Sequence, residues 1–247
     1  MVRLPEHDLA LPHWPARLDG LRVAVVTDLH AGGPRVGRRR IDRLVAAVNA
    51  AQPDLVALVG DYVDPHVLGG VRFDPAGVAR RLARLRAPAV AVLGNHDWHD
   101  EGHTVARLLR HAGLRLLENE AVRLDVRGGA LHVAGVGDLR ERDPRVGSAL
   151  ADVPEGEPIL LLSHDPDVFP YVPARVSLTL SGHLHGGQVD LPLIRRLMPT
   201  RHGSRFKEGH VVESGRHLFV SRGVGETGLP IRVRSAPEVP ILRLRAG

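Results

Sequence analysis

The sequence predicts an α/β fold in which two β-sheets pack together and helices cover them from outside. The first half of the chain alternates apolar runs of strand type with segments of helical periodicity, in the order β-α-β-α-β. The second half consists mainly of short strand-type stretches. At 247 residues the chain suits one domain spanning residues 1–247, long enough to bury a sizeable core.

The first half of the chain carries the expected β-α-β-α-β unit. Strands are expected at Leu21–Thr27, Leu55–Val59 and Ala89–Leu93, and helices at Val36–Ala51, Pro75–Arg86 and Thr104–Ala112. In the first of these helices, Ile41, Leu44 and Val48 recur at the spacing of one helical face. Gly113 follows the third helix, a position where glycine commonly ends helices.

The second half is expected to be mostly β-structure. Ala121–Val126 and Leu131–Val136 flank an Arg-Gly-Gly turn and predict a hairpin. Further strands are expected at Leu114–Leu117, Ile159–Leu162, Val176–Leu180, His210–Glu213, His217–Val220, Ile231–Val233 and Ile241–Leu244. A turn or short helix is expected near Asp165–Tyr171. Residues 1–20, with prolines and isolated apolar side chains, are expected to form an extended lead-in or a small docking segment.

Composition excludes several classes of protein. There is no cysteine, which excludes disulfides and thiolate metal sites. No apolar run approaches the ~20 residues that a membrane span requires, and no charged segment followed by an apolar one indicates a signal peptide at the start. We therefore expect a soluble, non-exported, cytoplasmic protein. The net charge of +5 is carried almost wholly by arginine, and suits anionic substrates, nucleic acid or anionic lipid without choosing among them.

Metal-ligand residues follow the strand-type runs. The segments are Asp28-Leu29-His30, Gly60-Asp61, Gly94-Asn95-His96-Asp97, Ser163-His164-Asp165 and Gly182-His183-Leu184-His185. Asp28 and His30 are expected on the same side of an extended backbone, as are His183 and His185, because residues i and i+2 of a strand face the same way. Carboxylates, an amide and imidazoles at the ends of buried strands would converge on one sheet edge. The pattern predicts a dinuclear metal site there.

The types of ligand indicate the metal and the reaction. Mixed nitrogen and oxygen ligands suit manganese, iron or zinc better than calcium or magnesium. The Asp61 carboxylate can bridge two cations, and Asn95 offers a neutral amide oxygen. Two ions about 3.5–4 Å apart would hold a phosphoryl group and lower the pKa of a bridging water. The expected reaction is in-line attack of that hydroxide on phosphorus.

Residues beside the ligands are expected to have supporting roles. His96 follows Asn95 and is expected to be the general acid that protonates the leaving oxygen, with Asp97 as the carboxylate that fixes its tautomer. Asp64 is expected to cap its loop and Asp165 to cap the following turn, neither binding metal. Arg222 could hold a substrate phosphate or could be a solvated side chain.

The ordered set D-L-H, G-D, G-N-H-D, S-H-D-P and G-H-L-H-G-G-Q resembles the calcineurin-like metallophosphoesterase superfamily. That family's pattern is D-x-H, G-D-x-x-D, G-N-H-[DE], a lone H and G-H-x-H, and all five blocks stand in order here. The resemblance implies a four-layer α/β sandwich with a dinuclear site at the strand ends. It implies one metal on Asp28, His30 and His185, a second on Asn95, His164 and His183, Asp61 as the bridge, and His96 as the acid.

The C-terminal segments S-R-G-V-G, L-P-I-R and P-E-V resemble a narrower subgroup, the bacterial phosphodiesterases related to membrane-anchored and exported members. Some members of that subgroup act on lipid-linked nucleotide diphosphates. The resemblance implies a metal-dependent phosphodiesterase acting on a small-molecule or lipid-linked phosphoester. The preference for diesters rests on this resemblance alone, and loops 64–74, 139–146 and 193–205 are where substrate choice is expected to be set.

Three other functions remain open at this stage. One is a pyrophosphatase for a UDP-diacylglucosamine-type lipid at the cytoplasmic membrane face, with Leu9, Leu11, Trp14 and Leu18 of the lead-in touching the membrane. Another is a nuclease, although the arginine run 38–40 lacks interleaved aromatic residues, which total 3% of the chain. The last is a non-enzymatic scaffold, which we expect to have lost ligands or His96, and this chain has lost neither.

Overall fold

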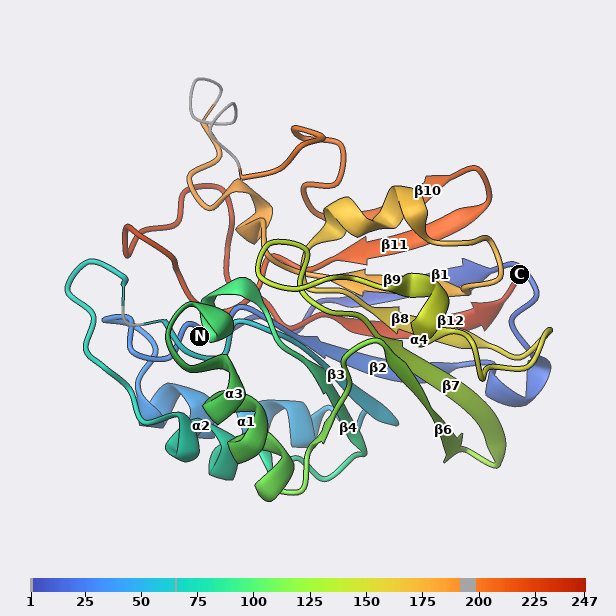
Figure 1. The fold of residues 1–247 in the computed structure, drawn as a ribbon, viewed down its shortest axis with the longest axis horizontal. Coiled ribbons are helices and arrows are strands. Elements are labelled where there is room, and N and C mark those ends of the chain that lie inside the picture. Colours follow the sequence, from blue (N-terminus) through green and yellow to red (C-terminus); the bar gives the residue numbers. More distant parts are fainter. Residues whose placement is uncertain (1, 65, 192–198) are drawn as a thin grey trace.

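The computed structural model describes residues 2–64, 66–191 and 199–247. In these ranges the chain forms two six-stranded mixed sheets (Figure 1). The first sheet has the strand order β1-β12-β2-β3-β4-β5, and the second has the order β10-β11-β9-β8-β7-β6. The two-sheet α/β fold predicted from the sequence is confirmed.

The first sheet is mostly parallel. Its strands are β1 (Glu6–Leu11), β12 (Ile241–Ala246), β2 (Leu21–Val26), β3 (Leu55–Val59), β4 (Ala89–Val92) and β5 (Arg115–Leu116). Strands β2 to β5 run parallel to one another, β12 runs antiparallel to β2, and β1 runs parallel to β12. The helices α1 (Arg38–Ala50), α2 (Pro75–Leu82) and α3 (Asn95–His111) lie together on its outer face (Figure 1).

The second sheet has a parallel centre and antiparallel edges. Its strands are β6 (Glu120–Val126), β7 (Gly129–Gly135), β8 (Ile159–Leu162), β9 (Leu178–Ser181), β10 (Gly209–Glu213) and β11 (Arg216–Val220). Strands β7, β8, β9 and β11 are parallel, and the predicted β6–β7 hairpin is antiparallel. Short helices cover its outer face, namely α4 (Val146–Ala149) and the 3-10 helix η2 (Pro166–Tyr171).

Alternating side chains build three apolar cores between four layers. In β2, Leu21 and Val23 pack between the two sheets, whereas Ala24 and Val26 pack against the helices. In β8, the even-numbered leucines face the first sheet and the odd-numbered residues face the outer short helices. Because successive residues of a strand point to opposite faces, each central strand fills two cores at once. The layers are therefore helices, sheet, sheet and short helices, as in the predicted four-layer sandwich.

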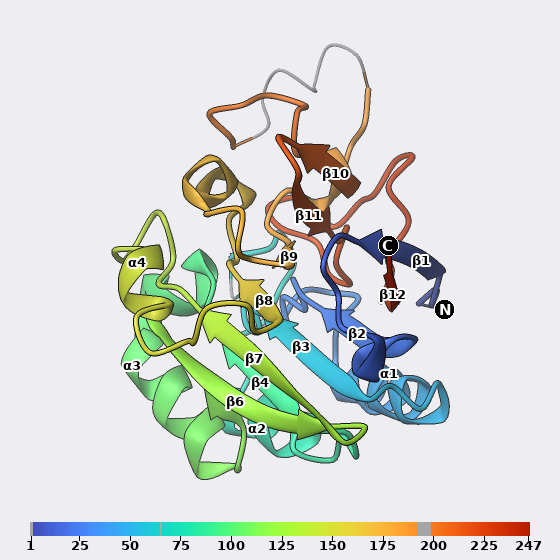
Figure 2. The same cartoon turned by 90° about the vertical axis from the view of Figure 1, so that its right-hand side faces the viewer.

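Residues 6–11 form a sheet strand, which differs from the expected lead-in. β1 lies beside β12 at the edge of the first sheet (Figure 2). The apolar side chains expected to touch a membrane, those of Leu9, Leu11, Trp14 and Leu18, are buried between the sheets. That expectation is wrong, because these side chains have no surface to offer a bilayer. Within the described ranges, no helix combines the length and the apolar character that crossing a membrane requires.

Other elements differ from the prediction as well: α2 ends at Leu82, four residues before the expected end, and α4 was not expected. Helix α3 begins at Asn95, nine residues before the expected Thr104, so the Asn-His-Asp segment forms its first turn. Gly94 is its N-cap, and the Asp97 carboxylate accepts the Gly94 amide at 3.0 Å, which stabilises this polar start. Residues 231–233 do not form a strand, and Val233 makes only an isolated bridge with Val189.

Candidate metal centre

The predicted ligand segments meet at one edge of the two sheets. They follow the carboxyl ends of β2, β3 and β4 in the first sheet and of β8 and β9 in the second. Within each sheet these strands are parallel, so their carboxyl ends share an edge. The side chains expected to bind metal are all buried, and they are Asp28, His30, Asp61, Asn95, His164, His183 and His185.

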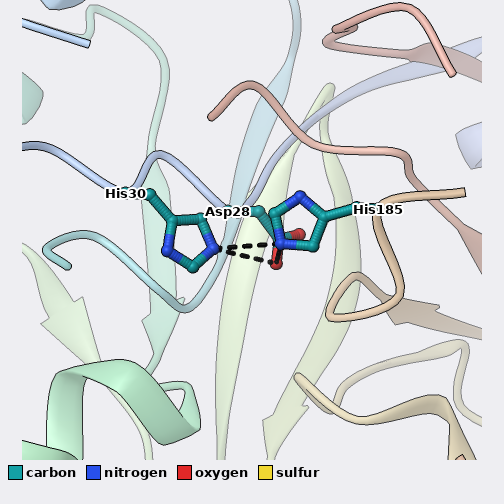
Figure 3. A group of neighbouring side chains, drawn as sticks. All are labelled: Asp28, His30 and His185. Carbon is teal, nitrogen blue, oxygen red and sulfur yellow. Dashed lines mark hydrogen bonds and ion pairs between the residues drawn. The ribbon is translucent and has the colours of Figure 1, made fainter. Parts of the chain in front are cut away.

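Asp28, His30 and His185 form the first group of candidate ligands (Figure 3), and a further group of His30, Asp64 and His96 adjoins it. The Nε2 atoms of His30 and His185 lie 3.1 Å apart. Asp28 Oδ1 lies 3.4 Å from His185 Nε2 and 3.8 Å from His30 Nε2. Both imidazoles and the carboxylate therefore point at a common centre (Figure 3).

Asp61, His164 and His183 form the second group. His164 Nε2 lies 3.1 Å from Asp61 Oδ2 and 3.3 Å from His183 Nδ1. The same Asp61 oxygen lies 3.6 Å from His30 Nε2 in the first group. Asp61 thus stands between two adjoining His/Asp groups, an arrangement consistent with a dinuclear metal site.

The distances and the donor set fit two cations. Two imidazole nitrogens bonded to one tetrahedral cation at about 2.0–2.1 Å lie about 3.3 Å apart. The ring nitrogens of the two groups are 3.1 and 3.3 Å apart. Asn95 Oδ1 is buried and has no hydrogen-bond partner in the described part of the chain. A buried oxygen without a partner is unfavourable unless something else uses its lone pairs, which a cation would do.

Contacts at Nδ1 orient the rings of two candidate ligands, so that the other ring nitrogen, Nε2, points into the site. His164 Nδ1 lies 2.7 Å from the Val59 carbonyl, to which it donates. His30 Nδ1 lies 3.0 Å from Asp64 Oδ2. In each ring the proton on Nδ1 is held outside, so Nε2 is the atom that faces the centre.

Charge is concentrated within this buried volume. Burial opposes ionisation of every group, yet the contacts with Asp28 and Asp64 raise the pKa of His30 to about 10. The pKa of His164 is raised for a similar reason, chiefly by Asp61, and the pKa of Asp61 is lowered by the same pairing. Burial lowers the pKa of His183 to about 3. Asp28, Asp61 and Asp64, whose pKa values are all lowered, are thus held as anions, and they attract positive charge, whether from protons or from cations.

The backbone at the ligands is left-handed and not extended. Five ligands have positive φ, namely Asp28 at 52°, His30 at 44°, Asp61 at 55°, His183 at 69° and His185 at 52°. Asp and His tolerate this region better than most residues, but it still costs free energy at each position. The predicted convergence of each pair is observed, but the extended-strand reason given for it is wrong. The chain turns sharply as each strand ends, and that turn aims the side chains.

Glycines next to the ligands let the segments approach closely. A Cβ atom at Gly94 would lie 2.3 Å from Asp61 Oδ1, and one at Gly182 would lie 2.4 Å from Asp28 Oδ2. Only residues without a Cβ leave room for the carboxylates at these two points. The glycines of the G-N-H-D and G-H-L-H segments are therefore part of the geometry that seats the ligands.

His96 lies beside the two groups, but its carboxylate partner is not the one we expected. Its side chain is 18% exposed, and its Nδ1 lies 3.2 Å from Asp64 Oδ2. Asp97 instead accepts the amides of Asp61 and Tyr62, each at 2.8 Å. The expectation that Asp97 orients the His96 ring is corrected accordingly. Asp97 comes one residue after His96 in a helix, where neighbouring side chains point in different directions.

Asp64 does more than the loop capping expected of it. Its Oδ1 accepts the His66 amide at 2.8 Å, which is the predicted cap. Its Oδ2 lies between His30 Nδ1 at 3.0 Å and His96 Nδ1 at 3.2 Å. A single buried carboxylate thus holds both a candidate ligand and the candidate acid. The spacing G-D-x-x-D marked Asp64 in the sequence. Spacing alone does not show which histidine rings the Asp64 carboxylate contacts.

Thr227 and Gln188 also belong to the site; nothing in the sequence indicated Thr227, and Gln188 stood out only as the end of a motif. Thr227 Oγ1 lies 3.4 Å from His96 Nε2 and 3.3 Å from Asp64 Oδ2. Gln188 accepts the Thr227 amide at 2.9 Å and donates to the Thr227 carbonyl at 2.8 Å. The residue that ends G-H-L-H-G-G-Q therefore fixes a distant loop beside the acid.

Other expected residues lie at the margin of the centre. Asp165 caps η2 through the Asp167 amide, as expected, and its Oδ2 lies 3.7 Å from His183 Nε2. Arg140, from loop 139–146, lies 3.2 Å from the same oxygen. Arg222 pairs with Glu208 and therefore does not face the centre as a free cation. The third expected substrate loop, 193–205, lies partly outside the described residues.

Solved structures support the fold. The chain superimposes on the crystal structure of a 5'-nucleotidase precursor from Thermus thermophilus with a TM-score of 0.53. The identity is 17%, and the match covers 88% of this chain and 55% of that chain. At this level of identity the likeness concerns the fold alone.

Sequence comparisons place the chain in a family. It matches the family model described as calcineurin-like phosphoesterase over residues 21–187. It is 28% identical to the uncharacterized metallophosphoesterase YkuE of Bacillus subtilis, over 100% of this chain and 86% of that protein. It is 31% identical to an uncharacterized metallophosphoesterase of Aquifex aeolicus, over 91% of this chain and 85% of that protein.

A third relative carries further sequence. The chain is 31% identical to a transmembrane protein with metallophosphoesterase domain from Danio rerio, and the match covers 96% of this chain. The match spans 56% of the zebrafish protein. The family model covers well over half of the chain and includes every candidate ligand. The chain therefore belongs to the calcineurin-like phosphoesterase family.

Proposed function

We propose that this chain is a dinuclear metal-dependent phosphohydrolase that acts on phosphodiesters. The observation that carries the proposal is the pair of buried His/Asp groups that share Asp61, with His96 beside them. In this proposal Asp28, His30 and His185 hold one cation and Asn95, His164 and His183 hold the other. Manganese, iron or zinc suits these nitrogen and oxygen donors.

The residues divide the chemistry between them. Two divalent cations held there would supply Lewis acidity and an activated water for attack on phosphorus. Asp61 lies where its carboxylate can touch both positions. The neutral Asn95 amide adds a ligand without adding negative charge that would repel a phosphate.

His96 is the proposed proton donor to the leaving oxygen. Asp64 lies against its Nδ1, so the proton given to the substrate would come from the opposite nitrogen, Nε2, beside the Thr227 hydroxyl. The partly exposed position of His96 suits this role, because a leaving group must reach it from solvent. The acid is thus oriented by a residue that also holds the ligand His30.

The preference for diesters is supported by the C-terminal segments S-R-G-V-G and L-P-I-R. They resemble those of bacterial phosphodiesterases related to membrane-anchored members. The zebrafish relative is named as a transmembrane protein with this kind of domain. A lipid-linked phosphoester is therefore a substrate worth testing beside soluble diesters.

Metal removal tests the proposal directly. We expect exhaustive chelation to abolish hydrolysis of an aryl phosphodiester, and added Mn²⁺ or a similar ion to restore it, because the cations supply the nucleophile. Elemental analysis of the same sample, before and after chelation, should show about two ions per chain lost and regained. Turnover that persists in fully metal-depleted protein would contradict the proposal.

Removing the Thr227 hydroxyl should weaken catalysis modestly. Thr227→Val deletes a contact with His96 Nε2 and with Asp64, and one such bond is worth a loss of about threefold to tenfold in kcat. The measurement is kcat on an alkyl diester, with Thr227→Ser as the matched variant that keeps the hydroxyl. A serine variant as slow as the valine variant would show that the methyl group, and not the hydroxyl, matters.

A further inference from the structure

Exposed apolar side chains gather in two loops beside the metal centre. Seven large apolar side chains of the described residues are exposed, and four of them lie in these loops. They are Leu68 at 66%, Val71 at 66%, Leu229 at 53% and Ile231 at 44% exposure. Exposed apolar residues scattered over a surface need no explanation, but this gathering does.

The two loops form one surface, and that surface adjoins the site. The Leu68 amide donates to the Gly228 carbonyl at 2.7 Å, and the Val71 amide donates to the Gly32 carbonyl at 2.8 Å. Loops 66–73 and 226–235 lie at the same end of the molecule (Figure 1). Leu68 follows Asp64 by four residues and Leu229 follows Thr227 by two, so the apolar tips flank the residues that contact His96.

Arginines without acidic partners lie next to these loops. A groove of about 800 Å³ beside the start of α1 is lined by Arg35, Arg38, Arg39, Arg40 and Arg43. Arg35 pairs with Glu226 at 3.6 Å, but Arg38, Arg39 and Arg43 form no ion pair with any described residue. Their charge is therefore available to an outside anion.

A second groove extends the positive surface. It has a volume of about 560 Å³ and shares Arg35 and Arg40 with the first. Arg234 lines it and likewise pairs with no acid among the described residues, whereas Arg222 pairs with Glu208 and Glu238. The two grooves together run from α1 to loop 226–235, which carries Leu229 and Ile231.

We propose that Leu68, Val71, Leu229 and Ile231, together with Arg38, Arg39, Arg43 and Arg234, form a docking surface for a bilayer that contains anionic phospholipid. Aliphatic tips enter the boundary between headgroups and acyl chains, while arginines beside them meet lipid phosphates. The four apolar residues include no aromatic ring on which bases could stack, which disfavours a nucleic acid as the occupant. Leu9, Leu11, Trp14 and Leu18 do not take part, since their side chains are buried.

Docking would turn the metal centre toward phosphoester headgroups. This consequence rests on the proposed function, whereas the docking itself does not. If both hold, the substrate class is a phosphoester presented at a membrane surface.

Vesicle sedimentation of the full metal-loaded chain tests the docking. We expect the protein to pellet with vesicles containing about one third phosphatidylglycerol and to stay in solution with pure phosphatidylcholine, because charge drives the approach. Raising the salt to about 0.5 M should weaken the binding, because it screens the arginines. Equal binding to both kinds of vesicle would overturn the proposal.

Two double variants probe the two components. Leu68→Ser/Val71→Ser and Arg38→Glu/Arg39→Glu should each lower the vesicle partition coefficient at least about tenfold. The matched controls are Tyr171→Ser/Val212→Ser, which changes exposed apolar side chains elsewhere, and Arg107→Glu/Arg110→Glu, which makes the same charge change on α3. Controls that lose as much binding as the test variants would overturn the assignment of the surface, as would tighter binding to duplex DNA than to vesicles.

A second readout separates docking from catalysis. The Arg38→Glu/Arg39→Glu variant should hydrolyse a soluble aryl diester at the rate of the unmodified chain, because both arginines lie at the start of α1, outside the metal centre. Vesicle binding by a chain that hydrolyses nothing would contradict the proposed function and support the docking. Hydrolysis without vesicle binding would support the proposed function and contradict the docking.

Discussion

Replacing Asp61 with asparagine is expected to remove metal and activity together. Its Oδ2 lies 3.6 Å from His30 Nε2 and 3.1 Å from His164 Nε2, so its carboxylate is placed between the two groups. The asparagine side chain has the same shape as that of aspartate, but it carries one oxygen in place of two and no negative charge. Loss of the cations removes several kcal/mol of transition-state stabilisation, which corresponds to a fall in kcat/KM of about 10³-fold or more.

The measurement is metal content per chain by elemental analysis, followed by kcat/KM on an aryl diester. Asp152→Asn is the matched control, because Asp152 is exposed and has no ion-pair partner among the described residues. The Asp61 Oδ1 atom also accepts the His96 amide at 2.9 Å, a bond that the asparagine oxygen can keep. Loss of activity therefore cannot be assigned to a displaced helix start. An Asp61→Asn chain that keeps both ions and near-normal turnover would refute the bridging position.

The fold was predictable from the sequence where local patterns and tertiary packing agree. Runs such as Leu55–Val59 and Ile159–Leu162 are apolar at every residue, as expected for strands buried on both faces, and the structure gives them these bounds. β1 was missed because Leu9 and Leu11 are buried only through pairing with β12, more than 230 residues away. The start of α3 was missed because Asn-His-Asp-Trp-His has weak helical propensity, and capping by Asp97 outweighs that preference.

The site was predictable to the level of which residues converge. Metal-ligand residue types placed after consecutive strands led to seven side chains; the structure groups six of them in one buried centre, and the seventh, Asn95, is buried at the start of α3. The partners of His96 were not predictable in the same way. Asp97 is its neighbour in sequence, but side chain direction in the first helical turn places Asp64 on the ring instead. Thr227 reaches His96 from a loop 131 residues away, which no local pattern could indicate.

Replacing His96 with asparagine is expected to slow the cleavage of poor leaving groups by about 10²–10⁴-fold while leaving the metal content near normal. An alkoxide needs a proton as the bond to phosphorus breaks, whereas a nitrophenolate leaves without one. The loss should therefore be much smaller on a nitrophenyl diester than on an alkyl diester. His99→Asn is the matched control, since the His99 ring lies 5.0 Å from that of His96 and pairs with Glu141 at the surface.

The carboxylate that orients His96 can be identified by the same leaving-group comparison. Asp64→Asn removes the charge beside His96 Nδ1, so it should slow alkyl diesters more than nitrophenyl diesters. Asp97→Asn disturbs the amides of Asp61 and Tyr62, which hold the ligand loop, so it should slow both substrates alike and lower the metal content. If Asp97→Asn showed the leaving-group dependence and Asp64→Asn did not, the acid would be oriented through the helix turn, and the contact at Asp64 would serve His30 alone.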